Sequence, residues 1–213
     1  GPHARGHRLL HGLVRARAQA MQGAVPAGVG AMAALLGLED DAARAACAEA
    51  AQGEVVEAVN FNSPGQIVIA GHAAAVQRAI AAAKARGAKR AVALPVSAPF
   101  HSSLMAPAAL KLREVLAGID IKAPAIPVVH NIDAQVRSTP EAIREALVAQ
   151  ADHPVLWTAC VKAMAEAGVT HVYESGPGKV LAPQSRRIDG RLEGLALADR
   201  AGLDQGLQSF PRA

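Results

Sequence analysis

The chain has 213 residues, of which 51% are hydrophobic and 19% are charged, a balance that excludes disordered, collagenous and coiled-coil proteins. A chain of this length buries a core without disulfides, and its two cysteines, Cys47 and Cys160, indicate a reducing compartment and argue against a structural zinc site. No apolar run reaches the roughly 18 residues of a membrane span, so we expect a cytoplasmic protein that does not bind membranes. The first residues lack both a starting Met and the apolar core of a signal peptide, which predicts that a natural segment precedes residue 1.

The net charge of +4 comes from 22 basic and 18 acidic residues. Nucleic-acid binders concentrate basic residues and interleave aromatic ones, whereas only 2% of this chain is aromatic, so we expect no nucleic-acid partner. A mildly basic surface suits a small anionic substrate or an acidic protein partner. An ordinary solvated surface explains the same charge.

The first half of the chain predicts one helix and then a small α/β unit. An amphipathic helix from Leu9 to Gln22 is ended by Gly23 and Pro26. The next six elements follow in the order strand, helix, strand, strand, helix, strand: Gly30–Leu38, Glu39–Ala51, Glu54–Asn60, Gln66–Ala70, Ala73–Arg86 and Arg90–Val96. A turn at Asn62–Gly65 joins the two middle strands as a hairpin. This order predicts a ferredoxin-like (βαββαβ) unit over residues 28–97.

Strands and helices also alternate in the second half, which favours a parallel sheet covered on both faces. The predicted elements are Leu104–Ala117 (helix), Ile126–Val129 (strand), Pro140–Gln150 and Val155–Ala167 (helices) and Val169–Glu174 (strand). Two strands are few for such a sheet, so we expect part of a larger domain to be absent.

Three stretches could carry chemistry. In the first, Ser97–Met105, His101 lies between a predicted strand and a predicted helix, where an imidazole can act as a general base or simply cap the helix. The second, Asn60–Gln66, is explained by a hairpin turn alone. The third, Glu174–Gly178, is a glycine-rich turn that either binds an anion on its backbone N–H groups or only connects two elements.

Several short motifs are informative when they are taken together. They are, in chain order, Met21-Gln22, Val25-Pro26, Gly30–Ala33, Asn60–Gln66, Ile69–Gly71, Pro99–His101, Val155–Trp157 and Gly176–Leu181. In this order they resemble the malonyl-CoA:acyl carrier protein transacylase family over nearly the whole chain. The resemblance implies an α/β-hydrolase-like parallel-sheet core, here residues 1–27 and 98–213 and incomplete, with the ferredoxin-like subdomain at residues 28–97 inserted into it.

The resemblance also implies roles for individual residues. His101 matches the general base, and Gln150 matches the position whose backbone carbonyl orients that histidine, so the side chain of Gln150 is expected to matter little. Arg17 matches the arginine that pairs with the free carboxylate of the malonyl group. Met21 and Asn62 match positions that line the pocket.

The implied reaction moves malonyl from malonyl-CoA to a serine and then to the phosphopantetheine thiol of acyl carrier protein, for fatty-acid synthesis. It requires no metal or redox cofactor, and the complete enzyme is expected to be a monomer. The chain departs from the family because it contains neither a Gly-His-Ser-x-Gly elbow to carry the nucleophilic serine nor the family's glutamine-containing oxyanion loop. We therefore expect the chain alone to be inactive. The alternatives are a non-catalytic module that binds acyl carrier protein and an acyltransferase of polyketide synthesis.

Overall fold

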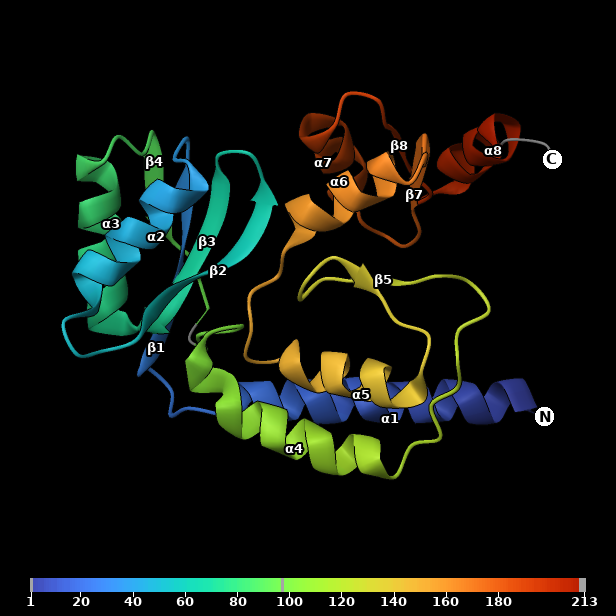
Figure 1. Ribbon diagram of the computed structural model, residues 1–213, viewed down its shortest axis with the longest axis horizontal. Helices are drawn as coiled ribbons and strands as arrows, with labels where there is room; N and C mark the ends of the chain where they lie inside the picture. Colours follow the sequence, from blue (N-terminus) through green and yellow to red (C-terminus); the bar gives the residue numbers. More distant parts are fainter. Residues whose placement is uncertain (1, 97, 211–213) are drawn as a thin grey trace.

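The protein has a mixed α/β fold built around a four-stranded antiparallel sheet (Figure 1). The computed structural model describes residues 2–96 and 98–210, with side chains from residue 10 onward. The strands of the sheet have the order β2-β3-β1-β4, and two helices cover one of its faces. In chain order these six elements are β1 (Gly30–Leu36), α2 (Asp40–Ala51), β2 (Val56–Ser63), β3 (Gln66–His72), α3 (Ala73–Ala85) and β4 (Arg90–Ala93). The sequence of strands and helices in this unit is the predicted one.

Small and branched apolar residues fill the space between this sheet and its two helices. Leu35, Ile67 and Ile69 from the sheet and Val76 from α3 are almost fully buried in one cluster. Gly71 is required in β3 because a Cβ there would lie 2.0 Å from the carbonyl oxygen of Val55. The unit therefore has a continuous core of its own.

Several predicted boundaries in this unit are wrong by two or three residues. β1 ends at Leu36, because Gly37 follows with a φ of +74°, and β4 ends at Ala93 instead of Val96. β2 continues to Ser63, so the hairpin turn consists of Pro64 and Gly65 alone, with Gly65 at a φ of +71°. Register shifts in β2 lengthen this strand relative to its partner β3.

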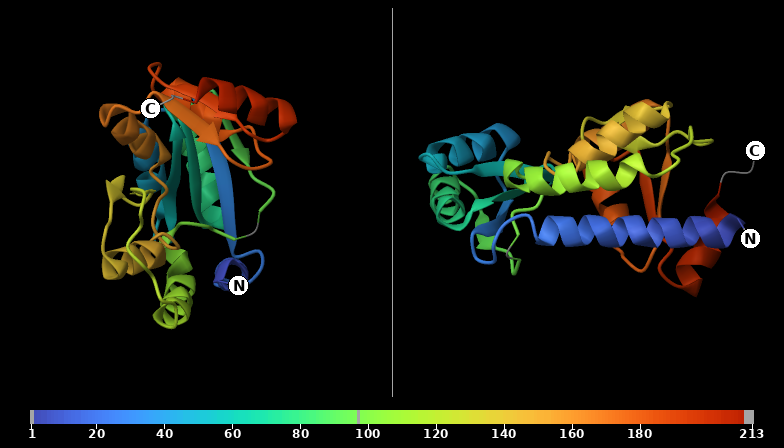
Figure 2. Two further views of the ribbon diagram at one scale, coloured as in Figure 1. Left: turned by 90° about the vertical axis from the view of Figure 1, so that its right-hand side faces the viewer. Right: turned by 90° about the horizontal axis from the view of Figure 1, so that it is seen from below.

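The other elements are mostly helices. They are α1 (Pro2–Gln22), the 3-10 turn η1 (Ser103–Met105), α4 (Ala106–Ala117), β5 (Val129–His130), β6 (Gln135–Val136), α5 (Pro140–Ala149), α6 (Trp157–Glu166), β7 (His171–Glu174), α7 (Leu181–Ile188), β8 (Glu193–Ala196) and α8 (Arg200–Ser209). The long helix α1 lies beside α4, and α4 packs in turn on α5 (Figure 2). None of the helices in the described ranges combines the length and apolar character that a membrane crossing requires.

Parallel pairing is sparse in residues 98–210. The only parallel strand pair that the described residues form is β7 with β8, while β5 and β6 form a short antiparallel hairpin. The strand predicted at Ile126–Val129 is reduced to Val129–His130, because Pro124 and Pro127 have no N–H to contribute to a ladder. Val155 pairs in parallel with the edge of β2, which delays the start of α6 to Trp157.

Candidate active site

A cavity of about 410 Å³ lies where α1 meets the four-stranded sheet and the turn before α4. Its lining consists of Arg17, Ala18, Met21, Gln22, Met32, Asn60, Phe100 and His101. None of these lining residues is acidic. Arg17 is thus the only formally charged lining residue at neutral pH, and the cavity is suited to an anion.

Helix α1 brings Arg17 and Met21 to the cavity because the two residues are one turn apart on the same face. Met21 is 4% exposed and packs with Met105 and Ala108, which fixes this end of α1 against α4. Arg17 is half-buried, and burial lowers the pKa of its guanidinium. An arginine keeps its charge throughout the physiological range, so the cavity holds a fixed positive charge.

His101 projects from a tight turn between β4 and α4. Its φ of +65° is unusual for a residue with a side chain, and such conformations cost about 1–3 kcal/mol and are concentrated at functional sites. The turn is closed by the buried Ser102, whose hydroxyl donates a 2.6 Å hydrogen bond to the carbonyl oxygen of Pro99. Ser97, the first residue of the predicted motif, lies outside the described residues.

Gln150 at the end of α5 fixes the tautomer of His101. The Nδ1 atom of His101 lies 3.0 Å from the backbone oxygen of Gln150, and a carbonyl only accepts, so Nδ1 carries the proton and Nε2 a lone pair. Burial, together with the charge of Arg17, lowers the pKa of His101 below its ordinary 6.5, although the Gln150 carbonyl acts in the opposite direction. The ring is therefore neutral at pH 7 and can accept a proton at Nε2.

The side chain of Gln150 also belongs to the site. Its Oε1 accepts a hydrogen bond from an Nη atom of Arg17, and its Nε2 lies 3.2 Å from Nδ1 of His101. The structure thus brings Arg17, Met21, His101 and Gln150 together from three separate segments of the chain.

The fifth predicted residue, Asn62, is not part of the cavity lining, and Asn60 takes that place. β2 has a register shift between Ala58 and Asn60, and Val59 packs with Met32 on the same side of the sheet as the cavity. The choice of Asn62 came from the family resemblance and not from strand alternation, which a bulge interrupts. Asn60 and Met32 are therefore lining residues that sequence reasoning missed, although both lie within the recognised motifs.

The start of α7, which follows the glycine-rich turn of residues 174–178, is already bonded to a carboxylate of the chain itself. The carboxylate of Glu174 accepts hydrogen bonds from the backbone N–H groups of Val180, Leu181 and Ala182 at the start of α7. These bonds lower the pKa of Glu174. The anion that this helix terminus attracts is supplied by the chain itself, which favours the structural interpretation of the turn.

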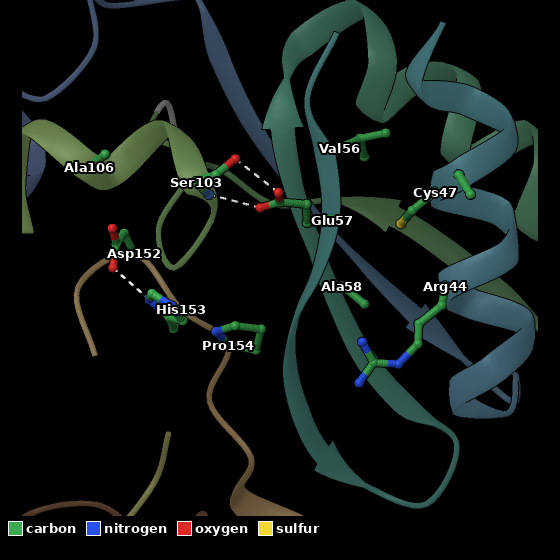
Figure 3. A pocket seen from close by; sticks show the side chains of 11 residues that line it. Arg44, Cys47, Val56, Glu57, Ala58, Ser103, Ala106, Asp152, His153 and Pro154 are labelled. Atoms are coloured by element: carbon green, nitrogen blue, oxygen red, sulfur yellow. Dashed lines mark hydrogen bonds and ion pairs between the residues drawn. The ribbon is translucent and has the colours of Figure 1, made fainter. Parts of the chain in front are cut away.

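A larger cavity of about 570 Å³ lies at the free edge of β2 (Figure 3). Its two carboxylates have partners within the chain: Glu57 accepts from the N–H (2.8 Å) and the hydroxyl (2.9 Å) of Ser103, and Asp152 contacts His153 at 2.7 Å. Burial raises the pKa of the Cys47 thiol to about 12, so it is not a nucleophile at neutral pH. The contacts of Glu57 and Asp152 hold the segments that follow His101 and Gln150, and the one hydroxyl in the lining, that of Ser103, is bonded to Glu57 and not to a histidine.

The two serines that follow His101 in sequence, and Ser63 at the hairpin end of β2, make hydrogen bonds with groups other than the imidazole. The hydroxyl of Ser102 donates to Pro99, that of Ser103 to Glu57 and that of Ser63 to the side chain of Gln66. Among the described residues, no group of three or more His, Cys, Asp or Glu is placed to hold a metal ion. The site is therefore a neutral imidazole beside a charged guanidinium, an arrangement suited to proton transfer on an anionic substrate.

Comparison with known families agrees with this chemistry. The acyl transferase domain family matches residues 12–186. The chain belongs to this acyl transferase family. It is 54% identical to the malonyl CoA-acyl carrier protein transacylase of Escherichia coli K12 over 196 residues, which cover 92% of this chain and 63% of the relative.

Solved structures show the same similarity. The crystal structure of the acyl-carrier-protein S-malonyltransferase of Burkholderia pseudomallei 1710b superposes with a TM-score of 0.90 at 62% identity, covering 92% of this chain and 64% of that one. A malonyl-transacylase in complex with its type II PKS acyl-carrier protein gives a TM-score of 0.90 at 49% identity, covering 92% of this chain and 63% of that one. This acyl transferase chain thus spans a little under two thirds of the length of its relatives.

Proposed function

We propose that the chain is the malonyl-binding and proton-transferring part of a malonyl-CoA:acyl carrier protein transacylase that serves fatty-acid synthesis. The observation that carries this proposal is the pairing of Arg17, whose charge faces a cavity without acidic residues, with a neutral His101 whose Nδ1 is held by Gln150. A guanidinium binds a carboxylate through two parallel hydrogen bonds, which suits the free carboxylate of a malonyl group.

The domain division that we propose follows the same reasoning. Residues 28–97 form the ferredoxin-like subdomain, and residues 1–27 and 98–213 belong to an α/β-hydrolase-like core whose parallel sheet is only partly represented. The order β2-β3-β1-β4 supports the first assignment, and the parallel pair β7–β8 supports the second. The cytoplasmic location remains a prediction from the sequence.

In the proposed reaction His101 transfers protons in two half-reactions. Nε2 takes the proton of a serine hydroxyl as that oxygen attacks the thioester carbonyl, and the imidazolium then protonates the departing thiolate of CoA. In the second half-reaction Nε2 takes the proton of the phosphopantetheine thiol, whose sulfur attacks the acyl-serine, and the serine oxygen recovers the proton. The chain contains no Gly-His-Ser-x-Gly segment, so we assign the serine to the part of the enzyme that this chain does not span.

Substrate selectivity tests the role of Arg17. In a full-length protein that contains this chain, Arg17→Ala is expected to lower kcat/KM for malonyl-CoA on the order of 100-fold, the loss of a charge-assisted hydrogen-bonded pair, and that for acetyl-CoA far less. Arg15→Ala, on the same helix but exposed, is the matched control. Equal losses for malonyl-CoA and acetyl-CoA would exclude the carboxylate pairing.

Acylation tests the role of His101. In the same full-length protein, His101→Ala is expected to abolish the malonyl adduct that intact-mass spectrometry detects after brief exposure to malonyl-CoA, whereas the exposed His153→Ala variant keeps it. An undiminished adduct in His101→Ala would exclude the general base.

Two alternatives remain. The absence of the serine elbow favours a non-catalytic module that binds acyl carrier protein. If this alternative is correct, the 213-residue chain binds acyl carrier protein in a pull-down and forms no malonyl adduct. The similarity to a malonyl-transacylase solved with a type II PKS carrier favours a role in polyketide synthesis. The relative rates of transfer to fatty-acid and polyketide carriers would distinguish these two pathways.

A further inference from the structure

Gln150 forms hydrogen-bond contacts with both functional side chains of the cavity. Its backbone oxygen lies 3.0 Å from Nδ1 of His101, and its side-chain Oε1 accepts from the Arg17 guanidinium. The two contacts use different atoms of one residue at the end of α5. A change of the side chain therefore removes the contact with Arg17 and leaves the backbone oxygen in place.

The contact with Arg17 also fixes how the Gln150 amide is oriented. A guanidinium only donates, so Oε1 must face Arg17, and the NH₂ group is then turned toward His101, at 3.2 Å from Nδ1. The proton on Nδ1 already points to the closer backbone oxygen, so the amide gives His101 no second strong hydrogen bond. The principal hydrogen bond of the Gln150 side chain is thus the one with Arg17.

From these contacts we propose that the Gln150 side chain is a positioning residue that orients Arg17 for a ligand carboxylate. The inference rests on the proposed function. Oε1 contacts a single Nη atom, and a guanidinium has five N–H donors, so enough donors remain for two parallel bonds to a carboxylate. A long, flexible arginine loses less conformational freedom on binding when one of its donors is already held.

The neutrality of Gln150 is part of this role. A glutamate at this position has the same shape, but its carboxylate would pair with Arg17 and compete with an anionic ligand for the same donors. It would also place a negative charge about 3 Å from the imidazole and raise the pKa of His101. Arg17 is the charged group that lowers this pKa in the native site. Glutamine therefore supplies an acceptor without neutralising the cavity.

Binding of malonate to the 213-residue chain, followed by NMR, tests the inference. Wild type, Gln150→Ala and Gln150→Glu are titrated with malonate and with malonamide, a neutral probe of similar shape that has no carboxylate. We expect Gln150→Ala to weaken malonate binding about fivefold, the effect of losing one hydrogen bond, and Gln150→Glu to weaken it more than tenfold. Malonamide binding should change little. Gln19→Ala, which removes an exposed amide of α1 outside the cavity lining, is the matched control.

The titration curve of His101 gives a second readout that a loss of folding would not imitate. Gln150→Glu is expected to raise the pKa of His101, and Gln150→Ala is expected to keep the proton on Nδ1, because the backbone oxygen remains. Malonate affinity equal to wild type in both variants would overturn the inference and leave the proposed function intact. A wild-type chain that shows no malonate response dependent on Arg17 would overturn both.

Discussion

The four-stranded unit and the rest of the chain differ in how completely they bury their apolar residues. In the unit one continuous cluster joins the sheet to α2 and α3, and the most exposed large apolar residue of the unit is Val96 at 40%. Outside it the core is divided among smaller clusters, and Ile126, Val180 and Leu207 are 77%, 59% and 69% exposed. Yet Arg17, His101 and Gln150 all come from this second region. Stability and chemistry are therefore concentrated in different parts of the chain.

The largest effect is expected from the core of the four-stranded unit. Leu35 is fully buried between the sheet and its helices, so Leu35→Ala should lower the free energy of unfolding by about 3–4 kcal/mol, through lost burial and a residual cavity. Urea unfolding measures this loss. Leu110→Ala, at a side chain that is 65% exposed in α4, should change stability by less than about 0.5 kcal/mol. Similar losses in both variants would contradict the comparison.

A smaller effect is expected at the contact that joins the two regions. Glu57 of β2 accepts from the N–H and the hydroxyl of Ser103, two residues after His101 (Figure 3). Glu57→Ala should cost about 1 kcal/mol and accelerate hydrogen exchange of the Ser103 amide. Glu49→Ala, which removes an exposed ion pair with Arg86 inside the unit, is the control and should leave that amide unchanged. Unaltered exchange at Ser103 in Glu57→Ala would show that the contact does not hold the His101 turn.

The smallest effect is a pH dependence due to His101. Its pKa in the folded protein lies below 6.5, the value expected in the unfolded chain, so the unfolded state binds the proton more readily. The free energy of unfolding should therefore be unaffected above about pH 6.5 and fall as the pH drops toward the folded pKa. Comparing urea unfolding of wild type and His101→Gln between pH 7.5 and 5 isolates this contribution. If the wild type instead gains stability relative to the variant as the pH falls, folding raises the pKa of His101, which contradicts the prediction.

The order of strands and helices in the four-stranded unit could be predicted because each element has a clear period and its partners are close in sequence. The boundaries could not, since the bulges of β2 depend on pairing with β3. Asn62 was implied by the family resemblance alone, whereas the cavity lining contains Asn60 of the same motif. In the second region the prolines around Ile126 prevented the strand that its apolar residues predicted.

His101 was indicated by its place between a predicted strand and a predicted helix, but the rest of the candidate site was predictable only through family resemblance. Spacing alone gave no reason to assign Arg17 to the site, because its position on the helix is typical of an exposed residue. It also gave no reason to assign a role to the Gln150 side chain. The contact between these two joins residues 133 positions apart, and no local pattern reports such a contact. The hydrogen bonds between Glu174 and the start of α7 could likewise not be predicted from the sequence, because a glycine-rich turn is equally compatible with binding of an external anion.

The account depends most directly on His101 being a neutral base held by Gln150. Long-range ¹⁵N–¹H correlation spectra of the 213-residue chain at pH 7 report the protonation of both ring nitrogens. The account predicts a protonated Nδ1 and an unprotonated Nε2 for His101, with titration at a pH below 6.5. A ring protonated on Nε2 alone, or on both nitrogens at pH 7, would contradict it, since Nε2 would then have no lone pair with which to take a proton from the attacking group.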